Sequence, residues 1–150
     1  MPAVGPLLRL VIATQDEAFR ATEYPAILTY AKRLVALASS LGNPVIWPVG
    51  EAAERLAGSA IVVGRGRPRV RNWSGYLREE SVLLVCVAAA TPLPLRAAAE
   101  QARALGAKRV DACGVSVCGI VGVREGASFG AYVSLQRNVN ASCIQSPIAI

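Results

Sequence analysis

The stretch SVLLVCVAAATPLPLRAAAEQARALGAKRVDACGVSVC, residues 81–118, decides the fold. It opens with a nearly continuous apolar run, residues 81–87, of the kind found in a strand that is buried on both faces. Residues 97–105 have high helix propensity, and Gly106 follows them as a helix-ending residue. Residues 109–117 are again apolar and β-rich, so the stretch predicts a strand, a loop, a helix and a second strand.

The same alternation precedes this stretch. Residues 7–13 (LLRLVIA) predict a strand. Residues 26–41 predict a helix with Pro25 in its first turn, because their apolar positions recur at helical spacing. Residues 45–48 (VIWP) predict a short buried strand.

Three further segments lie between these elements and the central stretch. Residues 50–57 (GEAAERLA) predict a short helix that Gly58 ends, and residues 59–63 (SAIVV) predict the next strand. Residues 64–80 are rich in glycine and arginine and predict an irregular loop or a hairpin arm. Near the other end of the chain, residues 129–135 alternate as a strand does.

Strands that alternate with helices predict a parallel sheet with helices on both faces. We therefore expect one domain, residues 1–150, of the α/β class, with three layers and a mostly parallel sheet flanked by helices. The apolar residues 141–150 predict either an edge strand packed within the domain or the interface of a homodimer.

Charge and composition narrow the function. The formal net charge is +6 and the pI is near 9.6, which favours an anionic partner, although a solvated arginine surface gives the same composition. Histidine is absent, which excludes a Ser-His-Asp or Cys-His hydrolase within one chain. The four cysteines fit buried structural thiols better than a disulfide or a metal site.

The chain shows no sign of a membrane segment. No apolar stretch approaches the roughly 20 residues that a bilayer span needs. Residues 1–13 lack the basic start and the cleavage site of a signal peptide. We expect a cytoplasmic protein without a membrane partner.

Ligands of an open α/β sheet bind at the carboxyl ends of its strands, so the loop at residues 88–95 is the first place to look for a site. Backbone N–H groups there, together with the positive end of the following helix, attract a phosphate. The segment resembles the signature of the phosphoribosyltransferase family, in which a hydrophobic strand ends in two acids and a Thr-Thr-Gly-any-Thr loop leads into a helix. Residues 82–85 match the strand, residues 95–98 match the start of the helix, and residues 25–117 follow the family's order of elements.

The resemblance implies a fold and a site. In the family, the acidic pair contacts the ribose hydroxyls of phosphoribosyl pyrophosphate and the loop surrounds its 5-phosphate. In this chain Cys86 and Val87 stand in place of the acids, and Pro92 and Pro94 lack an N–H donor. Thr91 alone keeps a loop hydroxyl.

Two further anion sites are predicted. Four arginines lie two residues apart and are followed by Trp73: Arg65, Arg67, Arg69 and Arg71. On a strand or arm they would share one face that grips phosphates or bases, or else protect a sheet edge from aggregation. Gly50 and Glu51 form a turn that the resemblance places against pyrophosphate, and Gly50 also fits a plain helix N-cap.

We therefore expect a phosphoribosyltransferase-related protein of nucleotide metabolism without catalytic residues for phosphoribosyl transfer. It would act as a binding, regulatory or assembly module for a phosphate-bearing ligand held by Thr91, Arg65, Arg67, Gly50 and Glu51. No metal or cofactor is expected, except magnesium if phosphoribosyl pyrophosphate still binds. One alternative is an active purine- or orotate-type transferase with a rearranged site. The other is a basic domain that binds nucleic acid through residues 65–73.

Overall fold

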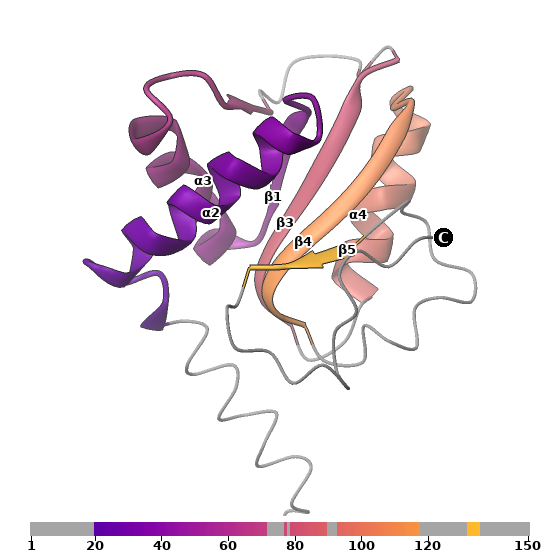
Figure 1. Cartoon of the computed structure of the whole chain (residues 1–150). Helices are drawn as coiled ribbons and strands as arrows, with labels where there is room; N and C mark the ends of the chain where they lie inside the picture. Colours follow the sequence, from indigo (N-terminus) through magenta and orange to yellow (C-terminus); the bar gives the residue numbers. More distant parts are fainter. Residues whose placement is uncertain (1–19, 72–76, 78, 90–92, 118–131, 136–150) are drawn as a thin grey trace, which may run out of the picture.

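The computed structural model describes residues 20–71, 77, 79–89, 93–117 and 132–135 of the chain. These residues form an open sheet of five strands in the order β2-β1-β3-β4-β5, and all of its pairings are parallel (Figure 1). The strands are β1 (Val45–Val49), β2 (Arg69–Val70), β3 (Ser81–Ala89), β4 (Arg109–Val117) and β5 (Tyr132–Ser134). The described part of the chain is therefore an α/β domain with a parallel sheet, as the sequence predicts.

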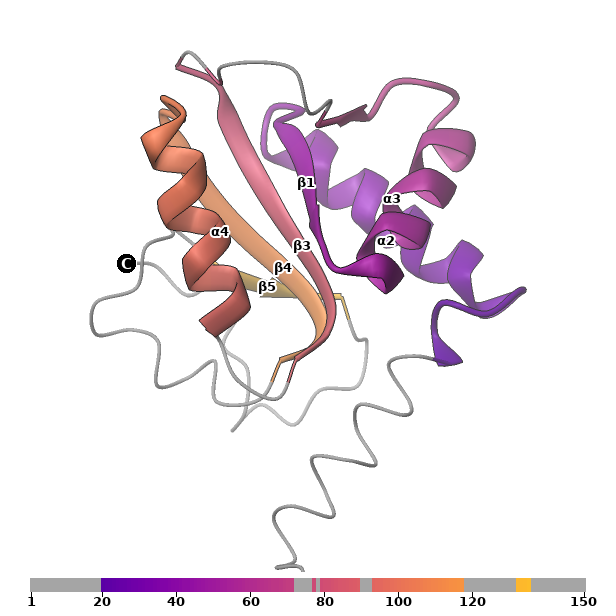
Figure 2. The same ribbon diagram turned by 180° about the vertical axis from the view of Figure 1, so that it is seen from behind.

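The helices cover both faces of this sheet and make three layers (Figure 2). Helices α2 (Ala26–Ser40) and α3 (Glu51–Val63) pack on one face, and α4 (Leu93–Ala104) packs on the other. Each face has its own core. The α2/α3 core includes the fully buried Leu34 and Leu56, and the α4 core includes the fully buried Leu95.

Strand β3 is the middle strand of the sheet, and it contributes to both cores. Residues 82–87 are all buried, which explains the unbroken apolar run in the sequence. Alternate side chains point to opposite faces of a strand. Val82 and Leu84 accordingly enter the α4 core, whereas Leu83 and Val85 enter the α2/α3 core.

The helices end in the same way, with a Schellman motif. After α2, the N–H of Gly42 donates to Ser39 O at 3.2 Å, and that of Asn43 donates to Ala38 O at 2.8 Å. Gly106 has the equivalent position after α4 and has a φ of 99°. After α3 this left-handed position is held by Arg65, whose φ is 52°.

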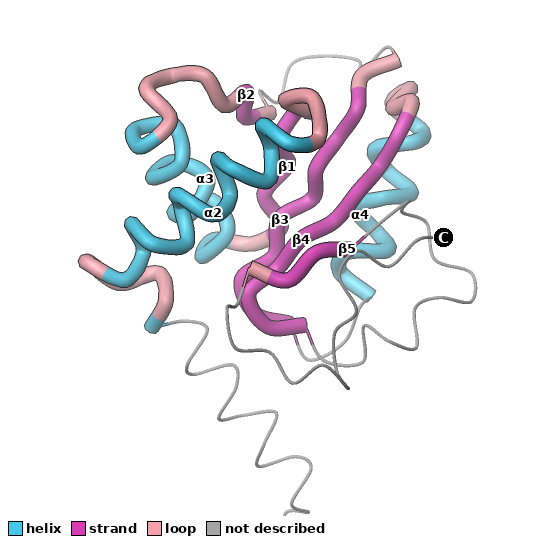
Figure 3. Tube along the Cα trace, viewed as in Figure 1, coloured by secondary structure: helices cyan, strands magenta, loops and turns pink. Residues whose placement is uncertain are grey.

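The end of α3 corrects two sequence predictions (Figure 3). The helix does not stop at Gly58 but runs on to Val63, so residues 59–63 are helix and not a strand. The error has a physical cause. The β-branched residues Ile61, Val62 and Val63 favour a strand in isolation, and the arginine in the capping position hides the true end.

The other elements agree more closely with the sequence. The predicted helix at residues 26–41 and the strands at 45–48, 81–87 and 109–117 are confirmed within one or two residues at each end. The predicted helix at 97–105 begins four residues earlier, at Leu93.

Among the described residues of 64–80, the structure has the short strand β2, and of residues 129–135 it describes the strand β5. Residues 7–13 and 141–150 lie outside the described residues. None of the described helices has the length and apolar character needed to cross a membrane.

Candidate functional site

The carboxyl edge of the sheet is the place where this fold presents a ligand site. Strand β1 passes through the single residue Gly50 into α3, and β3 is followed by α4. The first turns of α3 and α4 therefore lie at the same edge, on opposite faces of the sheet (Figure 2). Gly50 makes the direct passage possible, because its φ of 98° is a conformation that other residues rarely adopt.

Cys86 and Val87, which stand where the resemblance implies an acidic pair, are inside β3. The strand continues to Ala89, and the two side chains are only 3% and 1% exposed. Cys86 enters the α4 core and Val87 enters the α2/α3 core. Both side chains are packed in apolar cores, so neither is accessible to a ribose hydroxyl.

Burial also makes this position unfavourable for charge. Desolvation raises the pKa of Cys86 to about 11, although a hydrogen bond with the backbone of Ala88 acts in the opposite direction. The pKa of Cys113 is also raised, mainly by desolvation and to a smaller extent by the nearby Cys86. Both cysteines are free and buried, and they belong to different cores, as expected for structural thiols.

The turn at Gly50 gives mixed support for anion binding. Glu51 is exposed and forms an ion pair with Arg55 at 3.6 Å, four residues further along α3. Glu51 and Glu54 both lie in the first turn of α3, where they interact with the positive end of the helix and repel an incoming phosphate. Helix α4 has no acidic residue in its first turn. Thr91, which precedes it, lies outside the described residues.

The arginines predicted to join this site lie elsewhere. Helix α3 runs antiparallel to the strands, so Arg65 and Arg67, which follow it, lie at the amino edge of the sheet (Figure 1). Arg69 lies beside them, opposite Val45 at the start of β1. The structure therefore does not bring Arg65 and Arg67 together with Gly50 and Glu51.

Arg69 and Arg71, the last two of the series, have different partners. Arg69 donates to Asn43 O from Nη2 at 2.8 Å and from Nε at 3.3 Å, and its Nη1 lies 3.2 Å from Glu80 Oε2. Arg71 instead stacks on Trp47, with its guanidinium carbon 3.6 Å from the ring centroid. Desolvation lowers the pKa of Arg71. The sequence prediction treated Arg71 only as one member of the series, and its spacing from Trp47 gave no signal of this contact.

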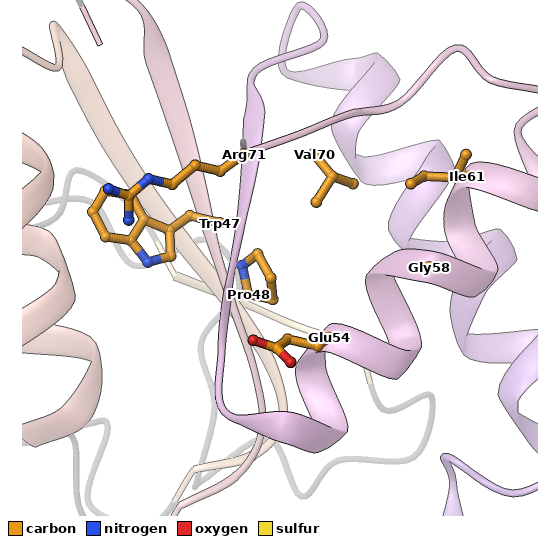
Figure 4. A pocket seen from close by; sticks show the side chains of 7 residues that line it. All are labelled: Trp47, Pro48, Glu54, Gly58, Ile61, Val70 and Arg71. Carbon is orange, nitrogen blue, oxygen red and sulfur yellow. The ribbon is translucent and has the colours of Figure 1, made fainter. Parts of the chain in front are cut away.

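A pocket of about 260 Å³ opens where Arg71 leaves the sheet (Figure 4). It lies at the outer edge of β1, between this strand and α3. Seven residues line it: Trp47, Pro48, Glu54, Gly58, Ile61, Val70 and Arg71. Of the predicted phosphate-site residues that the structure describes, Gly50, Glu51, Arg65 and Arg67, none is among them.

Comparison with known proteins adds no assignment. No protein-family model matches the chain, and no curated protein matches it in sequence.

Proposed function

We propose that this chain is a phosphoribosyltransferase-related domain that does not transfer phosphoribosyl groups and that serves as a binding or assembly module for a phosphate-bearing ligand. The order of elements from α2 to β4 is the order that the sequence resemblance implies. The observation that carries the loss of activity is the position of Cys86 and Val87, buried within β3 on opposite faces. Neither side chain can accept a hydrogen bond from a ribose hydroxyl there.

Support for a phosphate-bearing ligand comes from α4. Its first turn lies at the carboxyl edge of the sheet, after the end of β3, and contains no acidic residue. A helix of 12 residues has a positive end that favours an anion there. The N-terminal end of α3 is less suitable because Glu51 and Glu54 are in its first turn.

Two measurements test this proposal. Purified protein with magnesium, phosphoribosyl pyrophosphate and each common nucleobase or orotate should release no pyrophosphate above the rate without protein. Isothermal titration with ribose 5-phosphate, inorganic phosphate and ribose should show binding for the two phosphate compounds and none for ribose. Release of pyrophosphate would refute the loss of activity, and equal heats for all three compounds would refute phosphate recognition.

The two alternatives receive less support from the geometry. An active site assembled from Glu51 and the arginines would have to connect opposite edges of the sheet. In the described part of residues 65–73, Arg69 is engaged by Asn43 and Glu80 and Arg71 is stacked on Trp47, which leaves these two guanidinium groups less accessible to a nucleic acid. A salt titration of binding to single-stranded RNA tests the second alternative, which requires log affinity to fall linearly with log salt.

A further inference from the structure

The pocket between α3 and the outer edge of β1 has features that the carboxyl-edge proposal does not use, and it is independent of that proposal. One turn after another, α3 presents Glu54, Gly58 and Ile61 to the pocket (Figure 4). Val70 and Pro48 form the facing wall. The pocket therefore has an apolar middle and a carboxylate at one end.

Gly58 keeps this pocket open. Glycine destabilises the interior of a helix relative to alanine, so its presence needs a reason. Gly50 has a positive φ, and a Cβ on Gly64 would lie 2.6 Å from Pro68 Cδ, so both of these glycines have a structural reason. Gly58 has neither: it is inside a regular helix, and a Cβ there would meet nothing within 4 Å. The missing side chain leaves room for a bound group.

The edge of β1 does not suit a peptide strand as the occupant. The N–H of Arg71 donates to Ile46 O at 2.8 Å, so the backbone groups of Ile46 point outward from the sheet toward β2. The backbone N–H and C=O groups of successive residues point alternately to the two sides of a strand, so those of Pro48 also face outward. Proline has no N–H to donate there. Among the described residues, β2 pairs with β1 only as far as Ile46. An added strand would therefore lose a ladder hydrogen bond at Pro48, whereas a small molecule would not need it.

The charges select the kind of molecule. Glu54 points into the pocket and, unlike Glu51, makes no ion pair with a described residue (Figure 4). The guanidinium of Arg71 lies over the indole ring of Trp47, on the other side of β1 from the apolar wall (Figure 4). Arg71 also lines the pocket, but its guanidinium is turned toward Trp47, so Glu54 is the charged group that faces the apolar wall.

We propose that this pocket binds a small organic amine, with its ammonium group beside Glu54 and its apolar body against Ile61, Val70 and Pro48. The volume of about 260 Å³ suits a ligand of one ring or a short alkyl chain. The site is distinct from the carboxyl edge, so a failure of phosphate binding there has no effect on it.

The test uses benzylamine and benzyl alcohol, which have the same shape and differ in charge. Amide chemical-shift mapping on the full chain should place benzylamine at Gly58 and Ile61, and benzyl alcohol should bind at least threefold more weakly. Glu54→Gln should weaken benzylamine binding about three- to fivefold, because a partly exposed ion pair contributes modestly, and should leave benzyl alcohol unchanged. Glu51→Gln, on the same helix but outside the pocket, should change neither.

A second pair of variants tests the space itself. Gly58→Leu should abolish the binding of both probes while raising the melting temperature, because leucine favours the helix and faces open space. Val62→Leu, at a position that is 77% exposed on the same helix, should leave binding intact. Equal affinity for the two probes, no effect of Glu54→Gln, or shifts centred away from Gly58 would each overturn the proposal.

Discussion

Restoring one acid of the implied pair gives a direct test of whether the end of β3 is a site or part of the core. The substitution is Cys86→Asp, with Cys86→Asn as a neutral control of the same shape. Cys86 is 3% exposed, and burial raises the pKa of its thiol from 9.0 to about 11. A pKa raised this far corresponds to a cost of roughly 3 kcal/mol for the charged form. An aspartate in this environment should therefore titrate near pH 6, about two units above its ordinary value of ~3.9.

The sign of the pH dependence follows from this raised pKa. Below about pH 4 the carboxyl is protonated in both the folded and the unfolded chain, so the Asp and Asn variants should be equally stable. Between about pH 4 and pH 6 the unfolded chain releases its proton while the folded chain keeps it, so the stability of the Asp variant falls as the pH rises. Above about pH 6 the difference should stay constant at roughly 3 kcal/mol.

The assay is urea denaturation of both variants at intervals from pH 4 to pH 8, followed by circular dichroism. A second series at pH 7.5 contains magnesium and phosphoribosyl pyrophosphate, which should not change the unfolding midpoint of the Asp variant. A difference that is independent of pH would show that position 86 is hydrated. Stabilisation by phosphoribosyl pyrophosphate would show that the carboxylate meets a ligand. Either result would refute the conclusion that Cys86 belongs only to the core.

Three further substitutions test the fold around the candidate sites. Arg65→Gly should raise the free energy of unfolding by about 0.5–1 kcal/mol, because Arg65 has a φ of 52°, which glycine adopts without strain. The control Arg67→Gly, at a position outside the left-handed region, should lower the free energy of unfolding. If urea denaturation gave the same sign for both variants, the capping role of residue 65 would be contradicted. Arg69→Met should lower the free energy of unfolding by about 1 kcal/mol, because it removes the partly exposed contacts of Arg69 with Asn43 and Glu80. The matched control Arg67→Met should leave the free energy of unfolding nearly unchanged. Leu56→Ala, at 1% exposure, should cost about 2–5 kcal/mol, whereas Val62→Ala, at 77% exposure, should cost no more than about 0.5 kcal/mol. Comparable losses for Leu56→Ala and Val62→Ala by thermal melting would mean that residues 59–63 are a buried strand after all.

The class of the fold and most of its elements could be predicted from local patterns. The apolar run at residues 82–87 is long enough to show burial on both faces, and β3 indeed contributes side chains to both cores. Gly42 and Gly106 mark the ends of α2 and α4 because only glycine adopts their positive φ without strain. Where that signal was absent, at Arg65, the end of α3 was misplaced and a helical segment was predicted as a strand.

The grouping of side chains depended on the tertiary structure. Sequence alone determined that Cys86 and Val87 have no carboxylates and that Pro92 and Pro94 have no N–H donors. It could not show that Arg65 and Arg67 lie at the opposite edge from Gly50, because that depends on the antiparallel course of a helix whose end was hidden. Nor could it show the pocket at Gly58 or the stacking of Arg71 on Trp47. These arise only when parallel pairing sets Val70 beside Ile46 and brings residues distant in the chain into contact.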